Sequence, residues 1–416
     1  MIHARLHKEN LFDKEILLQN ELIHMYAKCG ALLRARKVLE EVKIRDIVSW
    51  TALISGYAQE RLVEEVFGCL KQMQHEGQWP NEVTIICILK AYISTGALDK
   101  GIEIHELISR EKTWEQNTQV CNALVDMYSK CNMLTKAQEV FDELLVRDIV
   151  SWTTLLSGYA QQGHGEEALQ CFERMHCETA MPNVVTLVCM LKASGSIGAI
   201  NRGREIHSKI INGQLQGVLV GNALVDMYAK CGIVEKAQTE FNEIQCQNVV
   251  SWTALIAGYG HLGYDEMAIE LFNKMIGEGV EPNAVTFSVV LNACSHSGLL
   301  DMGQLYFESM SKCYNIIPTS EHYTSMVDLF GRIGLFEHSI ALIEKIPTSD
   351  YLPTWTALLG SCQRLGNIKL GKLAFDYAVQ LDETNSVPYV CMRNIYATVH
   401  VEEDTNEIEA SDRYAH

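Results

Sequence analysis

The cysteines are the residues of this chain whose side chains could do metal or redox chemistry. There are 14 of them among 416 residues. No two stand in a Cys-x-x-Cys pair, the spacing that zinc and thiol redox sites favour. The first residues contain no apolar signal core, so a disulfide framework is not expected either. Cys29, Cys131 and Cys231 recur at matching places, and we expect them to be reduced, buried side chains that pack between neighbouring helices.

Three phrases recur along the chain at intervals of about one hundred residues. Asn-Ala-Leu-Val-Asp-Met-Tyr-Ser-Lys-Cys begins at Asn122, and close variants begin at Asn20 and Asn222. Val-Ser-Trp-Thr stands at 48–51, 150–153 and 250–253, and Ile-His stands at 2–3, 104–105 and 206–207. Each interval therefore contains three different sub-repeats.

Each sub-repeat has the pattern of a helical hairpin. In the one at 149–183, Ser151 is expected to cap the first helix and Gly163 to end it. A second helix with apolar residues at helical spacing is expected at 166–175, and Pro182 closes the unit. Neither helix can bury its apolar stripe alone, so neighbouring hairpins must stack. The predicted fold is all-α, an α-solenoid of stacked helix-turn-helix hairpins.

The sub-repeats at 16–46, 47–81 and 82–117 have lengths of 31, 35 and 36 residues in the order S, P, L, and a shorter L unit follows at 184–217. This alternation resembles the PLS class of plant pentatricopeptide repeat (PPR) proteins, and the resemblance implies a right-handed superhelix. Residues 293–299 and 321–329 resemble the distinctive last L and S repeats of that family. Residues 355–362, with 381–382, resemble its first E motif, and Tyr389 with 394–397 resembles the start of the second. The chain therefore resembles the E-type subgroup.

The resemblance divides the chain into four parts. Residues 1–15 are expected to end an L repeat, 16–351 to form the repeat array, 352–397 to form E-motif-like hairpins, and 398–416 to be an acidic tail without a packed core. The expected repeats are S 16–46, P 47–81, L 82–117, S 118–148, P 149–183, L 184–217, S 218–248, P 249–283, L 284–319 and S 320–351. Because the chain begins inside a repeat and ends in an unlike tail, we expect it to be truncated at both ends.

In this family the fifth and last residues of each repeat face one RNA base, and the second residue packs against base faces. Amide and hydroxyl groups carry donor and acceptor patterns suited to this task. By resemblance, threonine–asparagine pairs read adenine, asparagine–aspartate pairs read uracil, and an asparagine–asparagine pair reads a pyrimidine with cytosine favoured. The pairs are Thr51 with Asn81, Thr153 with Asn183, Thr253 with Asn283, Asn20 with Asp46, Asn122 with Asp148, and Asn222 with Asn248. The alternative is that these residues are helix caps and turn residues.

Two further sets of residues accompany these pairs. Val48, Val150 and Val250 hold the second position of the P repeats, and we expect them to lie against base faces. A basic residue stands at equal phase in each S repeat, either near the RNA backbone or solvated near a helix end; these are Lys28, Lys130 and Lys230. The remaining pairs match no base-reading pair, and their bases stay open; they are Ile86 with Asn117, Val188 with Gly217, Ser288 with Thr319, and Thr324 with Tyr351.

Composition limits the classes of function. Hydrophobic residues make up 48% of the chain, a globular balance, and no apolar run approaches the roughly 20 residues of a membrane span. The formal net charge of −18 argues against a strongly basic nucleic-acid surface. It is compatible with recognition by stacking and base-edge hydrogen bonds in a local groove.

The sequence therefore predicts a protein that binds single-stranded RNA and has no enzymatic activity and no cofactor. The resemblance implies an organellar factor, in the mitochondrion or chloroplast, that guides C-to-U editing by recruiting a DYW-type deaminase in trans. A deaminase zinc site needs Cys-x-x-Cys beside His-x-Glu, and the latter occurs alone, beginning at His7, His164, His176 and His400. The alternatives are a tetratricopeptide-like scaffold for a protein partner and a truncated family member without function.

Overall fold

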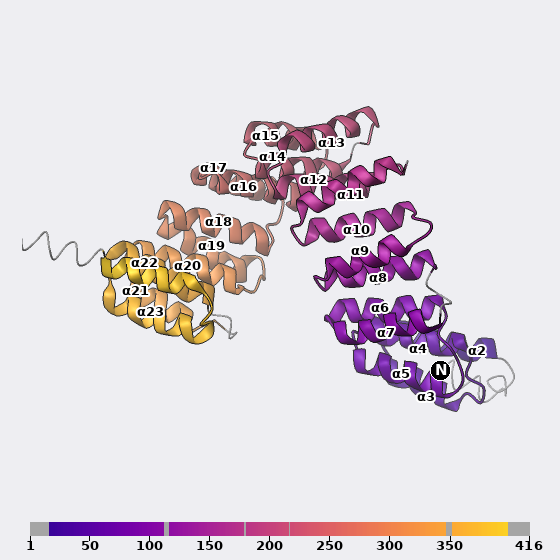
Figure 1. The fold of residues 1–416 in the computed structure, drawn as a ribbon. Coiled ribbons are helices and arrows are strands. Elements are labelled where there is room, and N and C mark those ends of the chain that lie inside the picture. Colours follow the sequence, from indigo (N-terminus) through magenta and orange to yellow (C-terminus); the bar gives the residue numbers. More distant parts are fainter. Residues whose placement is uncertain (1–15, 112–115, 179, 216, 347–351, 398–416) are drawn as a thin grey trace, which may run out of the picture. The chain divides into compact units, whose positions relative to one another are not determined.

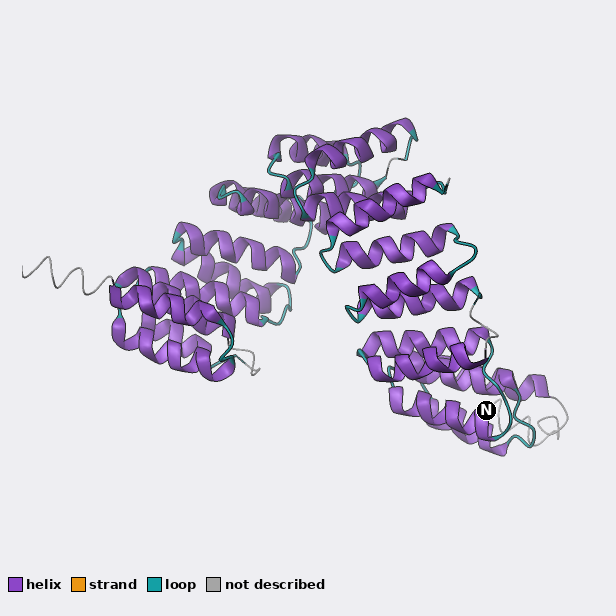
Figure 2. Ribbon diagram, in the orientation of Figure 1, coloured by secondary structure: helices purple, strands orange, loops and turns teal. Residues whose placement is uncertain are grey.

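The computed structural model describes residues 16–111, 116–178, 180–215, 217–346 and 352–397 (Figure 1). Within these ranges every regular element is a helix and none is a strand (Figure 2). This confirms the predicted all-α fold. The helices group into two compact units, one up to Ile197 and the other from Gly198 onward.

Unit 1 is built from helical hairpins. We call the first helix of each hairpin the A helix and the second the B helix. The hairpins are α2 (Ile16–Lys28) with α3 (Leu32–Glu41), α4 (Ile47–Gln59) with α5 (Val63–His75), α6 (Glu82–Thr95) with α7 (Leu98–Glu111), α8 (Thr118–Lys130) with α9 (Leu134–Glu143), and α10 (Ile149–Gln161) with α11 (Gly165–Cys177); the A helix α12 (Val184–Ser196) ends the unit.

Unit 2 continues the same pattern. It contains α13 (Ile200–Asn212), α14 (Val218–Lys230), α15 (Val234–Glu243), α16 (Val249–His261), α17 (Asp265–Gly277), α18 (Ala284–Ser297), α19 (Leu300–Cys313), α20 (Ser320–Arg332), α21 (Phe336–Ile343), α22 (Leu352–Leu365) and α23 (Ile368–Leu381). A further helical segment covers 386–397, and its Met392 and Ile395 share a core with Trp355 and Leu358 of α22.

Within each unit the A helices contact one another in succession, from α2 to α12 and from α14 to α22. The B helices α3, α5, α7, α9 and α11, and α15, α17 and α19, each pack against their own A helix and the next one. Hairpins therefore share a continuous core, as expected for a solenoid. The tryptophans of the recurring phrase anchor that core, because Trp152 and Trp252 are buried and contact Phe141 and Phe241 edge to face.

Small residues allow the A helices to approach closely. A β-carbon added to Gly158 of α10 would come within 2.4 Å of the Ser129 hydroxyl oxygen of α8. Glycines at the same phase of α4 and α16 meet alanines of α2 and α14 in the same way: a β-carbon on Gly56 or Gly258 would approach the β-carbon of Ala27 or Ala229 to 2.7 and 2.5 Å, respectively. Glycine is therefore required where these helices cross.

Two local expectations are corrected by the structure. The residue that caps α10 is Asp148, whose carboxylate accepts the backbone N–H of Ser151 at 2.7 Å; Ser151, the expected cap, lies three positions further on. The cysteines that follow α2, α8 and α14 are not buried packing residues. Cys29 is exposed, whereas Cys131 and Cys231 are half-buried, because they stand where helices end rather than on a core-facing stripe.

Candidate nucleic-acid interface

The last residue of each predicted pair caps the A helix of the next hairpin. Its side-chain oxygen accepts a backbone N–H from the first turn of that helix. This holds for Asp46, Asn81, Asp148, Asn183, Asn248 and Asn283. The capping interpretation is therefore correct for these six, and capping fixes the direction in which each side chain points.

In the P repeats a buried threonine joins the two members of each pair. Asn183 Oδ1 accepts both the backbone N–H of Thr186, at 2.8 Å, and the Thr186 hydroxyl, at 2.9 Å. The Thr153 and Thr186 hydroxyl oxygens are 2.9 Å apart. The arrangement recurs with Thr84 between Thr51 and Asn81 and with Thr286 between Thr253 and Asn283.

In the S repeats the two members of a pair contact each other directly. The Asn20 amide donates to the two Asp46 carboxylate oxygens at 3.3 and 3.2 Å. The Asn222 amide donates to Asn248 Oδ1 at 3.4 Å. Burial acts to raise the pKa of Asp46, but hydrogen bonds from Ser49 and Asn20 outweigh burial and hold that pKa below its usual value.

Asp148 is held in the same way as Asp46. Burial acts to raise its pKa, whereas hydrogen bonds from Ser151 and from Asn122 lower it, and the net direction is downward. The carboxylate at this position therefore stays ionised and offers acceptors only. The structure therefore brings the members of all three predicted S-repeat pairs close together.

The second-position valines lie on the surface, near the start of each A helix. Val48, Val150 and Val250 are 57%, 54% and 54% exposed. Apolar residues at the same position of other repeats are also exposed, which the sequence interpretation missed; they are Leu17, Val83, Val185, Leu219 and Val285. Their signal was available, because each is the second residue of an expected repeat. Each valine precedes a fifth residue by one helical turn, so both lie on one face.

The S-repeat lysines lie at the ends of A helices and are exposed. Lys130 and Lys230 form ion pairs of 2.9 Å with Asp126 and Asp226, four residues earlier. No described residue pairs with Lys28, because a histidine replaces the aspartate at position 24. Two of the three predicted backbone contacts are therefore already partly neutralised in the free protein.

The remaining pairs differ from these six. Ile86 is half-buried and Val188 is buried, and neither has a side-chain donor or acceptor. The Asn117 amide donates to Glu82 at 2.9 Å, while its oxygen caps α8. The predicted pairing of Thr324 with Tyr351 cannot be followed, because Tyr351 lies outside the described residues, as do segments 1–15 and 398–416 with His7 and His400.

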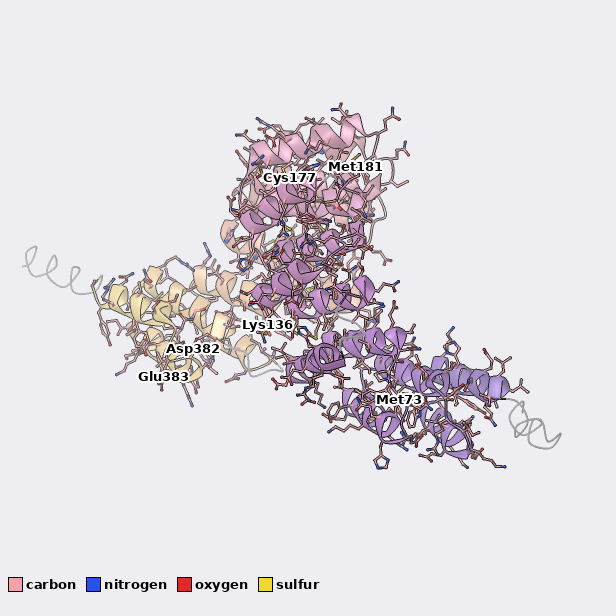
Figure 3. All side chains as sticks on the ribbon, turned by 45° about the vertical axis from the view of Figure 1, so that its right-hand side comes forward. Met73, Lys136, Cys177, Met181, Asp382 and Glu383 are labelled. Atoms are coloured by element: carbon pink, nitrogen blue, oxygen red, sulfur yellow. The ribbon has the colours of Figure 1, made fainter. Side chains whose placement is uncertain are left out.

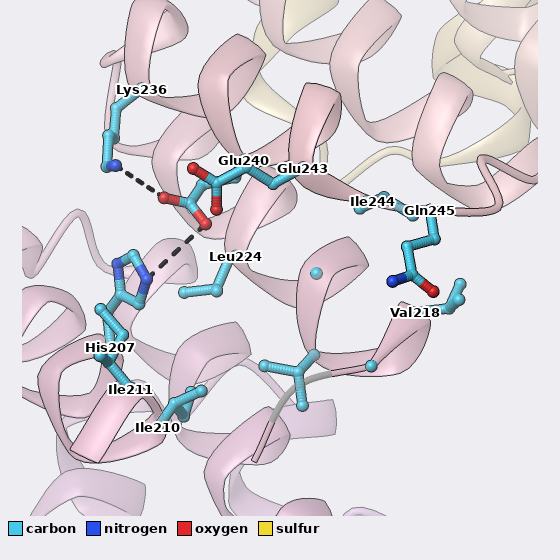
Figure 4. A pocket seen from close by; sticks show the side chains of 13 residues that line it. His207, Ile210, Ile211, Val218, Leu224, Lys236, Glu240, Glu243, Ile244 and Gln245 are labelled. Carbon is cyan, nitrogen blue, oxygen red and sulfur yellow. Dashed lines mark ion pairs between the residues drawn. The ribbon is translucent and has the colours of Figure 1, made fainter. Parts of the chain in front are cut away.

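Two cavities in the described part of the chain lie beside B helices. One of about 540 Å³ lies in unit 2 and is lined by residues of α13, α14 and α15. In it, Glu240 pairs with Lys236 at 2.8 Å and with His207 at 3.6 Å (Figure 4). A cavity at the same phase of unit 1 is lined by His105 and Lys136; Lys136 is labelled in Figure 3. No predicted base-reading residue lines either cavity.

Across the described ranges, no three histidine, cysteine, aspartate or glutamate side chains gather in a way that could hold a metal ion. His164 contacts Glu167, and His176 packs on Phe172. No helix in the described part of the chain is long and apolar enough to cross a bilayer.

Solved structures with this fold include a PPR protein. The structure of maize PPR10 in complex with an 18-nt psaJ RNA element matches 96% of this chain and 61% of that chain, with a TM-score of 0.75 and 16% identity. The structure of maize PPR10 alone matches 99% of this chain and 60% of that one, with a TM-score of 0.69. These likenesses establish the solenoid fold.

Sequence comparisons identify the family. The model of the PPR repeat family matches residues 45–94, 147–195 and 247–296, and the PPR repeat model matches 120–149, 285–314 and 321–351. A mitochondrial pentatricopeptide repeat-containing protein of Arabidopsis thaliana is 36% identical over 93% of this chain.

The chain covers 61% of that relative's length. A second pentatricopeptide repeat-containing protein of Arabidopsis thaliana is 36% identical, with 95% of this chain and 71% of the relative covered. The chloroplastic relative CRR2 is 35% identical, with 97% and 63% covered. With repeat models matching six segments and relatives aligned along nearly its whole length, this chain belongs to the pentatricopeptide repeat family.

Proposed function

We propose that this chain binds single-stranded RNA along its A helices, with one base at each polar pair. The observation that carries the proposal is the same local geometry at three P repeats: a hydroxyl and an amide joined by a buried threonine. A valine more than half exposed stands one turn before each hydroxyl. An apolar plate beside a donor–acceptor pair suits a stacked, edge-read base.

The proposal assigns adenine to the pairs of Thr51, Thr153 and Thr253, uracil to those of Asn20 and Asn122, and a pyrimidine to that of Asn222. With the RNA parallel to the protein, the expected register is 5′-U-A-n-U-A-n-Y-A-3′. The maize PPR10 structure that contains an RNA element supports this class of ligand. The repeat bounds of the PLS array at 16–351 and the E-motif-like hairpins at 352–397 belong to the same proposal.

The biological role we propose is that of a specificity factor for organellar RNA processing, in particular C-to-U editing, with a deaminase recruited in trans. Relatives named as mitochondrial and as chloroplastic support an organellar setting. In this role the chain supplies RNA recognition, and the partner supplies the chemistry.

Binding assays with short RNAs test the proposal. The RNA with the expected register should bind more tightly than one in which each assigned adenine and uracil is exchanged for its transition partner, at equal length and salt concentration. Equal affinity for the two RNAs contradicts base reading. Binding of a peptide without any RNA preference would favour the scaffold alternative.

A further inference from the structure

The third residue of each repeat that follows a P repeat lies against the base-reading pair of that P repeat. Thr84, Thr186 and Thr286 are fully buried. Each is bonded to both members of the pair before it, at oxygen–oxygen distances between 2.6 and 3.0 Å. These threonines therefore connect the fifth and last residues, although they cannot touch RNA themselves.

At Thr186 the number of hydroxyl protons limits which short contacts can be hydrogen bonds. Three short contacts meet at two hydroxyl groups: Thr153 to the Ile149 carbonyl at 2.7 Å, Thr153 to Thr186 at 2.9 Å, and Thr186 to Asn183 Oδ1 at 2.9 Å. Each hydroxyl has one proton, and the carbonyl and amide oxygens only accept. If the Thr153 proton pointed outward, two of the three contacts would lack a hydrogen bond. The Thr153 proton is therefore directed inward.

The amide of Asn183 is oriented by the same group of contacts. Backbone N–H groups only donate, so the atom facing the Thr186 N–H must be the amide oxygen. Its NH₂ group is then the part that faces away from the helix. The pair consequently presents a hydroxyl acceptor beside an amide donor. Adenine and cytosine carry a donor and an acceptor in one order along the Watson–Crick edge, and guanine and uracil carry them in the reverse order.

We propose that the third residue of the following repeat is a positioning residue, whose hydroxyl reinforces the order of acceptor and donor that the pair presents. It acts together with the Ile149 carbonyl and the backbone N–H of residue 186, which favour the same order. This inference rests on the proposed function and deepens it: the buried hydroxyl strengthens the discrimination of adenine from guanine, which are alike in size.

Other junctions follow the same rule. Thr324 contacts Thr354 at 3.0 Å, and Ser288 contacts His322 at 3.2 Å, so a polar fifth residue meets a polar third residue. The two apolar fifth residues precede repeats whose third residues are valines; the two sets are Ile86 and Val188, and Val120 and Val220. The side chain at the third position therefore matches the chemistry of the pair before it.

The test replaces Thr186 by valine, which keeps the shape and removes the hydroxyl, and by serine, which keeps the hydroxyl. Binding is measured with RNAs carrying adenine or guanine at the base assigned to Thr153 and Asn183. We expect Thr186→Val to lower the preference for adenine about fivefold to tenfold, as expected for one lost hydrogen bond. Thr186→Ser should retain the preference. The adenine assigned to Thr253 and Asn283 is the internal control.

The outcomes separate the two proposals. An unchanged preference in Thr186→Val, or an equal loss at both adenines, overturns the positioning role. Absence of any base preference in the unsubstituted protein contradicts the proposed function instead. In that case the positioning role is tested without RNA, from the side-chain amide NMR signals of selectively isotope-labelled asparagine. One sharp pair for Asn183 is expected with threonine or serine at position 186 and a broadened pair with valine; identical signals in all three proteins overturn it.

Discussion

At the residue scale, the side chains that cap helices on the candidate interface use only part of their hydrogen-bonding capacity for the cap. Asn183 caps α12 through its oxygen and keeps its NH₂ group outward, and Asp148 caps α10 while accepting from Asn122. Capping and base reading are therefore compatible, because a helix cap uses one side of the group and leaves the other to solvent.

Exchanging one pair for the other type tests base reading directly. Replacing Thr153 by Asn and Asn183 by Asp copies the pair formed by Asn122 and Asp148. Preference at the fifth base of the expected register should move from adenine to uracil by about 1–3 kcal/mol, a typical value for one base contact. Competition binding with RNAs that differ only at that base measures the change. Affinities like those of the parent protein for both RNAs would show that the register or the base-reading hypothesis is wrong.

His322 provides a pH-dependent contribution to stability. It is buried, and its Nε2 lies 2.8 Å from the Ala284 carbonyl oxygen. Since that oxygen only accepts, Nε2 carries the proton, and Nδ1 accepts from the Thr319 backbone N–H at 3.0 Å. Burial lowers the pKa of His322 below 6.5, although the bond to Ala284 opposes the shift. The unfolded chain therefore gains a proton at higher pH than the folded one, and stability falls as the pH drops below 6.5.

Replacing His322 by threonine, the residue found at this phase in other repeats, should weaken that dependence. The loss of melting temperature between about pH 7.5 and about pH 5.5 is expected to be smaller in the variant than in the parent protein. Replacing the exposed His75 by threonine is the matched control and should leave the dependence unchanged. A parent-like loss in His322→Thr would assign the acid sensitivity to other groups, including the half-buried His105, whose pKa is also lowered by burial.

At the element scale, stacking depends on how closely successive A helices approach. The glycine of each P-repeat A helix faces a small residue of the preceding A helix, and this close approach places successive polar pairs side by side on one layer. A larger side chain there would push two hairpins apart, since a packed interface has no room to absorb it.

Gly158→Ala is therefore expected to destabilise the protein by about 1–3 kcal/mol, the usual cost of overpacking. Gly68→Ala is the control within the same unit. A β-carbon at Gly68, inside α5, meets nothing within 4 Å, so alanine should stabilise that helix by up to about 1 kcal/mol. Denaturant unfolding of both variants measures the difference. Equal stabilities would contradict the close-packing argument.

At the scale of the whole molecule, charge limits how RNA can be bound. The net charge is −18, and two of the three candidate lysines are paired to aspartates, so few of these candidate cations are available to phosphates. Affinity should then depend weakly on salt. For each phosphate that is neutralised, log K falls by only about 0.7 per tenfold increase in salt concentration. Base contacts are expected to contribute a large share of the binding free energy.

Removing the aspartates that pair with Lys130 and Lys230 should change both the affinity for RNA and its salt dependence. Replacing Asp126 and Asp226 together by Asn should raise affinity and steepen the salt dependence by about 0.7 per lysine released. Glu308→Gln is the matched control, because it frees Lys312 from an equivalent pair on the B helix α19. Titrations at several salt concentrations provide the slopes. If the control steepens the slope as much as the double variant, the RNA backbone does not follow the A helices.

The sequence by itself determined the repeat, the hairpins and the all-α solenoid, because apolar periodicity, glycine breaks and recurring phrases are local features that any stacked array must display. The sequence also showed that the residues of the six pairs occupy the same positions, the fifth and the last, of their repeats. Only the tertiary structure decided how each pair is held. Thr186 is one position like many others in the sequence, and its contact with Thr153 exists because two A helices 33 residues apart pack together. The exposed line that Val83 and Leu219 extend, and the ion pairs that occupy Lys130 and Lys230, likewise depend on which helix face the stacking leaves to solvent.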